Sequence, residues 1–180
     1  MGIIGYGDIG RACGKLAKAY GMRVLGVRRT PENSANDRRC DKVYGMEGIG
    51  TVMQESDYVV VAMPLTADTM GLISAEILKL AKPGMVFINI GRGALVDERA
   101  LEQELEDGSR IAAAALDVFA VEPLPLTSKL WSLPNVLISP HNADILHNSR
   151  HNSVKFFTKQ CCNFLAGEEL EMIVDKTAGY

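Results

Sequence analysis

A glycine motif between a predicted strand and a predicted helix constrains the fold of this sequence more than any other feature. The motif Gly5-Tyr6-Gly7-Asp8-Ile9-Gly10 follows the apolar run Gly2-Ile3-Ile4 and opens a helical pattern over residues 10–20. A GxGxxG pattern alone is a weak signal, but this context of strand and helix is typical of a dinucleotide-binding βαβ unit. The alternative is a turn that merely requires glycines.

Each glycine of the motif has a separate expected role. Gly5 allows the tight turn, Gly7 lets a pyrophosphate approach the backbone, and Gly10 permits the helix to pack closely on the strand. The free N–H groups and the dipole at the helix start then hold the phosphates. The motif positions that we assign to the cofactor are Gly5, Gly7, Asp8, Ile9 and Gly10.

Short apolar runs alternate with helical patterns along the rest of the chain. Predicted strands cover residues 2–4, 23–27, 43–44, 58–62, 85–90, 111–116 and 136–138, and predicted helices cover 10–20, 74–81, 97–107 and 149–166. Residues 111–116 are ambiguous, because four alanines in a row favour a helix, whereas the short length and the place in the alternation favour a strand. We adopt the strand. The alternation predicts an α/β fold, a Rossmann-type doubly wound parallel sheet with helices on both faces.

Helical periodicity also predicts which side chains the helices bury. In the first helix, the expected buried face consists of Ile9, Cys13, Leu16, Ala17 and Tyr20. Ser74 is expected to cap the helix that follows it. In the last helix, the apolar stripe contains Val154, Phe157, Cys161, Phe164 and Leu165.

Composition excludes several classes of protein. The chain has 180 residues and a formal net charge of −3, so neither a nucleic acid nor an anionic membrane surface is the expected partner. The sequence contains no run of 18 apolar residues, so no membrane span is predicted. The cysteines Cys13, Cys40, Cys161 and Cys162 show no CxxC spacing, and we interpret them as reduced thiols in a cytoplasmic protein.

The end of the second predicted strand bears on the choice of cofactor. NAD-binding domains usually carry an acidic residue about 20 positions after the glycine motif, where it binds the adenosine ribose. Here Val27 is followed by Arg28, Arg29 and Thr30. Two guanidiniums and a hydroxyl would hold a 2′-phosphate that a carboxylate would repel. The segment therefore favours NADP over NAD, the alternative being two solvated arginines in a loop.

Several predicted strands end on a residue suited to ligand binding. Pro64, Arg92, Asp117 and His141 each follow an apolar run. In an open α/β sheet the ligand crevice lies outside the carboxyl ends of the strands, so these residues are expected at one edge.

Three further motifs resemble the signatures of the D-isomer-specific 2-hydroxyacid dehydrogenases. They are Asn89-Ile90-Gly91-Arg92-Gly93-Ala94-Leu95-Val96-Asp97, then Ala115-Leu116-Asp117-Val118-Phe119 with Glu122-Pro123, then Ser139-Pro140-His141-Asn142-Ala143. The glycine motif and the stretch from Met63-Pro64-Leu65-Thr66 to Thr69 fit as well, so that the resemblance runs across nearly the whole chain.

The resemblance implies a nicotinamide-dependent oxidoreductase with assigned catalytic residues. Arg92 would bind the substrate carboxylate, His141 would be the acid–base, Glu122 would pair with His141, and Asp117 would lie near the nicotinamide. The other positions assigned to the cofactor are Pro64, Thr69, Ile90 and Gly91. The expected substrate is a small 2-oxo or 2-hydroxy acid of the glyoxylate or hydroxypyruvate type.

The chemistry of these side chains agrees with the implied roles. A guanidinium can bind a carboxylate in a fork, and a histidine beside a carboxylate can supply a proton near neutral pH. The alternatives are a loop carboxylate at Glu122 and a structural histidine at His141. His147 and His151 lie four residues apart, but no further ligands accompany them, so no metal site is expected.

The chain departs from the family in length, because family members are usually near twice as long. We expect residues 1–142 to form the dinucleotide-binding domain, and residues 143–180 to be a C-terminal helical segment of a truncated substrate domain, to which the last helix would return. A homodimer is expected from the family, and an organellar location stays open beside the cytoplasmic one. Two alternatives to an active enzyme remain, a non-catalytic NAD(P)-binding module like the corepressor relatives and an inactive fragment.

Overall fold

The computed structural model of the chain describes residues 1–34, 36–145 and 147–177. It contains two compact units, Met1–His141 and Asn142–Tyr180. Residues 146 and 178–180 of the segment predicted to belong to a substrate domain lie outside the described residues. That assignment of the second unit stays a prediction.

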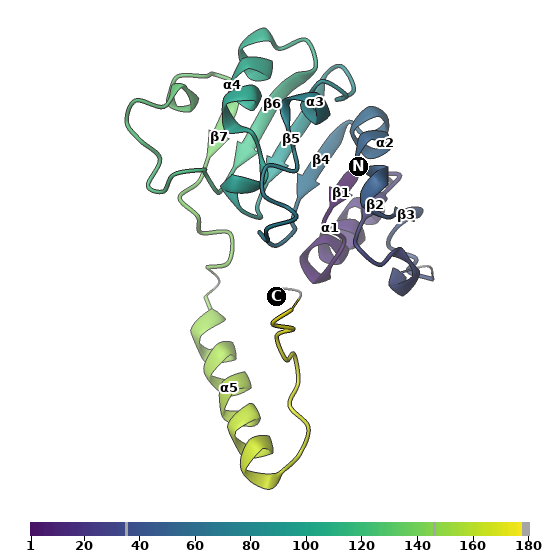
Figure 1. Cartoon of the computed structure of the whole chain (residues 1–180), viewed down its shortest axis with the longest axis vertical. Coiled ribbons are helices and arrows are strands. Elements are labelled where there is room, and N and C mark those ends of the chain that lie inside the picture. Colours follow the sequence, from purple (N-terminus) through teal and green to yellow (C-terminus); the bar gives the residue numbers. More distant parts are fainter. Residues whose placement is uncertain (35, 146, 178–180) are drawn as a thin grey trace. The chain divides into compact units, whose positions relative to one another are not determined.

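The first unit is built on a seven-stranded sheet in the order β3-β2-β1-β4-β5-β6-β7 (Figure 1). All neighbouring strands pair in parallel. The strands are β1 Gly2–Ile4, β2 Leu25–Val27, β3 Lys42–Tyr44, β4 Tyr58–Val61, β5 Met85–Asn89, β6 Ile111–Leu116 and β7 Val136–Ile138. The order reverses between β1 and β4, which is the point where doubly wound sheets bind their ligands.

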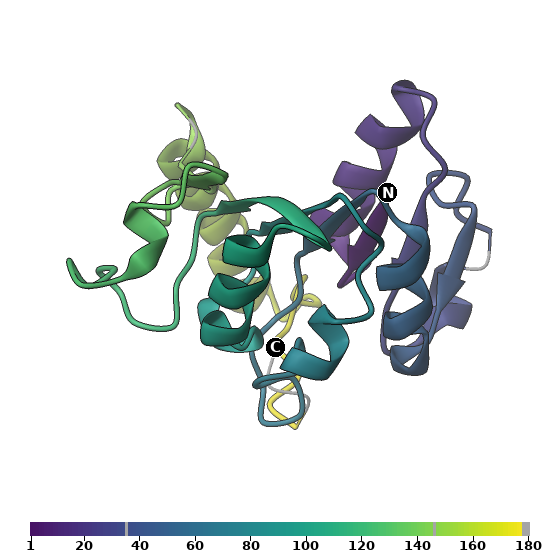
Figure 2. The same cartoon turned by 90° about the horizontal axis from the view of Figure 1, so that it is seen from above.

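Helices cover both faces of this sheet, as the fold-class prediction requires. They are α1 Asp8–Ala19, α2 Ile49–Glu55, α3 Ala75–Leu78 and α4 Glu98–Asp107. Figure 2 shows α1 on one side of the sheet and the other three helices on the opposite side. The predicted Rossmann-type α/β fold is confirmed. Helix α2 was not predicted, because it is short and contains a glycine.

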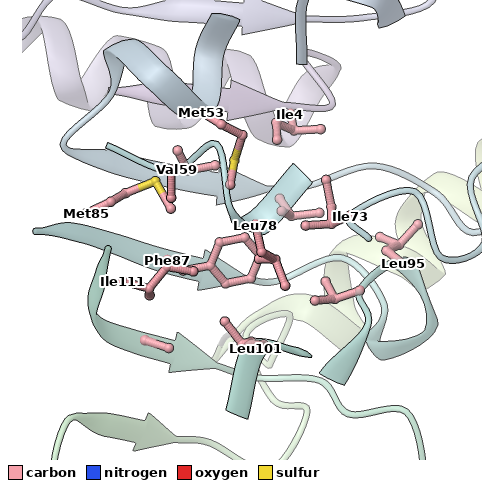
Figure 3. Packing of buried hydrophobic residues seen from close by; sticks show 14 of the residues in the cluster. Ile4, Met53, Val59, Ile73, Leu78, Met85, Phe87, Leu95, Leu101 and Ile111 are labelled. Atoms are coloured by element: carbon pink, nitrogen blue, oxygen red, sulfur yellow. The ribbon is translucent and has the colours of Figure 1, made fainter. Parts of the chain in front are cut away.

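Two hydrophobic clusters hold the helices on the sheet. The larger cluster joins the sheet to α2, α3 and α4, and Phe87 and Leu101 are among its fully or almost fully buried members (Figure 3). The smaller cluster joins α1 to β1 through Ile3, Tyr6 and Ala17. The carboxyl ends of the strands are thereby fixed relative to one another within the first unit.

The predicted buried face of α1 is confirmed for Ala17, which is buried, and for Cys13, which is partly buried, but it is wrong for the larger side chains. Ile9 and Leu16 are 58% and 63% exposed, and the buried residues are Gly10, Gly14 and Ala17. The reason is the closeness of the packing: a Cβ at Gly10 would lie 2.4 Å from the Gly5 carbonyl oxygen, and a Cβ at Gly14 would lie 2.9 Å from a backbone oxygen. Only small side chains fit this interface, so the larger apolar ones face outward.

Residues 111–116 form a strand, as we adopted. Strand β6 pairs with β5 on one side and β7 on the other, and Ile111, Ala114 and Leu116 are buried. Tertiary context therefore outweighs the helix propensity of the alanines. Ser74 precedes α3, but its hydroxyl donates to the Glu76 carboxylate instead of accepting a backbone N–H.

The second unit consists of helix α5, Ser149–Ala166, and a returning tail. Lys159 pairs with Glu171, and the Asn163 side chain donates to the Glu169 carbonyl oxygen. Phe157 and Phe164 are mostly exposed, and no residue of α5 is buried. Within the described ranges, no helix has the length and apolarity that crossing a membrane requires.

Candidate active site

The glycine motif forms a tight turn between β1 and α1. Gly5 has a φ of +99°, and its N–H and that of Tyr6 donate to the Val27 carbonyl oxygen. A Cβ at Gly5 would lie 2.6 Å from the backbone of Ala62 on the neighbouring chain segment. The turn is therefore possible only with glycine at this position.

Gly7 differs from the other glycines of the motif. A Cβ at Gly7 would meet nothing within 4 Å, and Gly7 is the N-cap residue of α1. No atom of the described residues explains the glycine, whereas a phosphate lying against the helix start would require it. Asp8 and Ile9 are exposed in the first turn of the same helix. The residues present thus fit a dinucleotide whose pyrophosphate lies against the amino end of α1.

The segment after β2 carries basic side chains, and it adjoins the glycine turn in space, because Gly5 and Tyr6 donate to the Val27 carbonyl oxygen. Arg28 is partly buried, and its Nη1 donates to the Ser34 hydroxyl at 2.5 Å, whereas Arg29 and Thr30 are exposed. The Asp37 carboxylate accepts hydrogen bonds from Arg39 and from the Arg11 Nε at 3.1 Å. The Arg39 guanidinium, through these hydrogen bonds, lowers the pKa of Asp37 to about 2.

The ion cluster around Asp37 is expected to make folding stability depend on pH. Because the folded-state pKa of Asp37 is lowered from 3.8 to about 2, its contribution is complete above about pH 4 and is lost as the pH falls through about 2. Asp37→Asn is expected to lower the free energy of unfolding at neutral pH by about 1–2 kcal/mol, allowing for partly exposed arginines. Urea denaturation between neutral pH and about pH 2 measures how this difference shrinks.

A matched control for this measurement is Asp68→Asn. Asp68 is exposed and forms no ion pair with any described residue. A difference between wild type and Asp37→Asn that stayed constant across the pH range would contradict the assignment.

The turn after β4 is held by Thr69. Its hydroxyl accepts the Thr66 N–H at 2.8 Å and donates to the Pro64 carbonyl oxygen at 2.9 Å. Thr69 is 9% exposed, whereas Pro64 is exposed. Thr69 thus fixes the turn that carries Pro64, and a direct contact of either residue with a cofactor stays a prediction.

Arg92 follows β5 on a loop that Asn89 organises. The Asn89 side chain accepts the Gly91 N–H and donates to the Arg92 carbonyl oxygen, both at 3.1 Å. Gly93 lies against the next loop: a Cβ there would be 1.8 Å from the Phe119 carbonyl carbon. Arg92 is exposed, and its Nη1 donates to the Gly91 carbonyl oxygen at 2.7 Å.

Glu122 and His141 form the central pair of the site. His141 Nδ1 lies 2.7 Å from Glu122 Oε2, and the other carboxylate oxygen accepts the Phe119 N–H at 3.0 Å. The hydrogen bond with His141 is the main cause that lowers the pKa of Glu122, and the Phe119 N–H and the more distant Arg92 charge act in the same direction. Glu122 is therefore held as a carboxylate between the imidazole and a backbone N–H.

The loop that carries His141 also forms a hydrogen bond with Asp117, the residue that follows β6. The Ser139 hydroxyl donates to Asp117 Oδ1 at 2.6 Å, and Asp117 is 5% exposed. His141 itself has a φ of +50°, in the left-handed region that few non-glycine residues adopt. A cavity of about 570 Å³ beside the pair is lined by His141, Glu122 and apolar side chains that include Trp131.

The structure thus brings Arg92, Asp117, Glu122 and His141 to the carboxyl ends of three adjacent strands, β5, β6 and β7. Sequence reasoning named Asn89 and Ser139 only as members of family motifs and did not name Ser34, so it predicted none of the hydrogen bonds by which these residues hold Arg92, Asp117 and Arg28. For Asn89 and Ser139 the available signal was a polar residue at the end of a strand, but this signal does not reveal the hydrogen-bond partner. Throughout the described ranges, no group of three or more His, Cys, Asp or Glu side chains could hold a metal ion.

Comparison with protein families gives one match over most of the chain. Residues 1–143 match the family model described as the NAD binding domain of D-isomer specific 2-hydroxyacid dehydrogenase. Over 178 residues the chain is 38% identical to the glyoxylate reductase of Pyrococcus furiosus, covering 98% of this chain and 51% of that protein. It is 40% identical to glyoxylate/hydroxypyruvate reductase B of Pectobacterium atrosepticum, covering 97% and 54%. The chain therefore spans about half the length of these relatives.

Solved structures resemble the chain closely. A D-isomer specific 2-hydroxyacid dehydrogenase from Xanthobacter autotrophicus, in complex with NADPH and MES, has a TM-score of 0.91 at 38% identity, covering 100% of this chain and 72% of that one. An NADPH-dependent glyoxylate/hydroxypyruvate reductase from Sinorhizobium meliloti, in complex with NADP and sulfate, has a TM-score of 0.88 at 32% identity, covering 99% and 56%.

Proposed function

The chain belongs to the D-isomer-specific 2-hydroxyacid dehydrogenase family through its NAD-binding domain, and on this basis we propose that it acts in the NADPH-dependent reduction of small 2-oxo acids. Relatives that carry the names glyoxylate reductase and glyoxylate/hydroxypyruvate reductase support this substrate class. The observation that carries the proposal is the pair of His141 and Glu122, 2.7 Å apart, at the sheet edge that also presents Arg92.

The proposed roles follow from the chemistry of each side chain. The Arg92 guanidinium binds the substrate carboxylate, since its N–H groups match the two carboxylate oxygens. His141 donates a proton to the carbonyl oxygen as that oxygen gains negative charge. Glu122 accepts a hydrogen bond from Nδ1 and thereby fixes the ring so that Nε2 faces the substrate. When bound, NADPH supplies the hydride.

Cofactor contacts are proposed for the turns at the same edge. The pyrophosphate would be held by the glycine motif, namely Gly5, Gly7, Asp8, Ile9 and Gly10. The 2′-phosphate would be bound by the segment after β2, namely Arg28, Arg29 and Thr30. The nicotinamide half of the cofactor would be surrounded by residues that follow β4, β5 and β6, namely Pro64, Thr69, Ile90, Gly91 and Asp117. Two neighbours solved with NADPH or NADP bound support the choice of the phosphorylated cofactor.

The cofactor preference is expected to depend on Arg28. Arg28→Asp is expected to weaken NADPH binding by about tenfold or more, because it replaces a cation with an anion where the 2′-phosphate would lie. The affinity for NADH is expected to change much less. Calorimetric titration of wild type and variant with both cofactors measures this. Equal or stronger binding of NADH by the wild-type chain would defeat the argument.

The enzymatic proposal is tested by following NADPH consumption with glyoxylate and with hydroxypyruvate. Turnover that is lost in a His141 variant supports the proposal. Tight NADPH binding without any turnover would instead favour the non-catalytic module. The absence of any cofactor-dependent rise in melting temperature would point to the inactive fragment. The predicted homodimer is measured separately, by sedimentation of the whole chain.

A further inference from the structure

We propose that Ser34 is a positioning residue that holds the Arg28 guanidinium ready for the 2′-phosphate of NADPH. The inference rests on the proposed NADPH preference and adds to it a residue outside the Arg28-Arg29-Thr30 segment. Its basis is the 2.5 Å hydrogen bond from Arg28 Nη1 to the Ser34 hydroxyl, which joins two residues six positions apart in the sequence.

Both ends of this contact are fixed by the surrounding backbone. The Arg28 N–H donates to the Tyr44 carbonyl oxygen at 3.0 Å, which continues the pairing of β2 with β3. Ser34 ends a short 3-10 helix, Pro31–Ser34, and is 5% exposed. The Ser34 carbonyl oxygen accepts the Asp37 N–H at 3.0 Å. The hydroxyl is therefore a fixed acceptor, and it selects one orientation of a long side chain that otherwise has many rotamers.

Ser34, the partner of Arg28, is uncharged, unlike the partner of the neighbouring arginines. Asp37 pairs with Arg11 and Arg39, so those two guanidiniums already face a carboxylate. Arg28, in contrast, forms no ion pair with an acidic side chain in the part of the chain that the structure describes. A hydroxyl orients the guanidinium without cancelling its charge. Among the described residues, one partner engages one of its five N–H donors, which leaves the others for phosphate oxygens.

A purely structural role for the contact makes a different prediction. If the Ser34 hydroxyl only fixed the 3-10 helix against the end of β2, removing that hydroxyl would weaken the binding of both cofactors alike or lower the stability of the cofactor-free chain. If Ser34 acts through Arg28 on the 2′-phosphate, its loss changes the ratio of NADPH to NADH affinity. The two readings are separable because NADH has no 2′-phosphate.

The test is a double-mutant cycle on the whole chain, with calorimetric titration of NADPH and of NADH at one ionic strength. Ser34→Ala is expected to weaken NADPH binding by about five- to tenfold and to change NADH binding by less than about twofold. In the Arg28→Ala background, the same Ser34→Ala change is expected to alter NADPH binding by less than about twofold, since its effect passes through Arg28. Ser132→Ala is the matched control, because that hydroxyl also makes a hydrogen bond, to the Lys129 carbonyl oxygen.

A second variant keeps the proposal testable if Ser34→Ala fails to fold. Ser34→Asp retains an acceptor but places a carboxylate on Arg28, and it is expected to weaken NADPH binding by about tenfold or more relative to wild type while changing NADH binding by less than about twofold. Unchanged NADPH affinity in the Ser34 variants, or an equal loss for both cofactors, would overturn the inference while leaving the proposed function intact. A wild-type chain that binds NADPH no better than NADH would overturn both.

Discussion

Replacing His141 with asparagine is expected to lower kcat for the proposed NADPH-dependent reduction of glyoxylate by about 10²–10⁴-fold. The variant removes the proposed proton donor, whose Nδ1 is held by Glu122 at 2.7 Å. Asparagine is the suitable replacement because it tolerates the φ of +50° that residue 141 adopts. Single-turnover measurement of NADPH consumption isolates the reaction from product release.

Two comparisons make this prediction specific. NADPH affinity is expected to stay unchanged in the variant, because His141 lies at the end of β7 and the glycine turn follows β1. Glu122→Gln is expected to lower kcat by a smaller factor, since it keeps the side-chain shape and removes only the charge beside the imidazole. A His141 variant with more than about a tenth of the wild-type kcat would exclude His141 as the general acid.

Gly93→Ala is expected to lower the free energy of unfolding by about 3 kcal/mol or more. A Cβ at this position would lie 1.8 Å from the Phe119 carbonyl carbon and 2.0 Å from its oxygen. Since these are backbone atoms, no side-chain rotation relieves the overlap, and the Arg92 loop or the Phe119 loop must move. Because Phe119 donates its N–H to Glu122, that movement also displaces the pair of Glu122 and His141, which is proposed to be catalytic. Urea denaturation gives the stability, and the Michaelis constant for glyoxylate reports the displacement.

Gly7→Ala is the matched control for this substitution. Its Cβ would meet no atom within 4 Å, and its backbone φ of −93° is open to alanine. We expect the stability of the cofactor-free chain to change by less than about 0.5 kcal/mol. NADPH binding is expected to weaken, because the methyl group would enter the space proposed for the pyrophosphate. If Gly93→Ala were no more destabilising than Gly7→Ala, the close contact of the two loops would be refuted.

The sequence predicts the strands and the position of the candidate site residues at one sheet edge well, because both depend on local signals. Apolar runs such as Tyr58–Val61 mark the buried strands, and the residues suited to ligand binding come directly after such runs. In a parallel sheet all carboxyl ends lie at one edge, so the placement of Arg92 and His141 at the same edge follows from topology.

Contacts between distant parts of the chain were not predictable in the same way. The buried face of α1 was misassigned, because periodicity favours large apolar residues such as Leu16, whereas the backbone of the loop near Arg39 leaves room only for Gly14. The partners of Asn89, Ser139 and Ser34 depend on which loops meet in space. Hydrophobic patterns contain no information about these side-chain hydrogen bonds.

The order of the strands has a consequence for how the site comes into existence during folding. The glycine turn depends on β1 and its two neighbours, β2 and β4, whereas the proposed acid–base pair of Glu122 and His141 needs β6 and β7 at the far end of the same sheet. Parallel pairing brings together residues that are distant in the chain and is slow for that reason. A chain that ended before β7 would keep every strand that the glycine turn contacts, whereas it would lack the strand that leads to His141. The proposed nucleotide contacts and the proposed proton transfer therefore depend on different parts of the sheet.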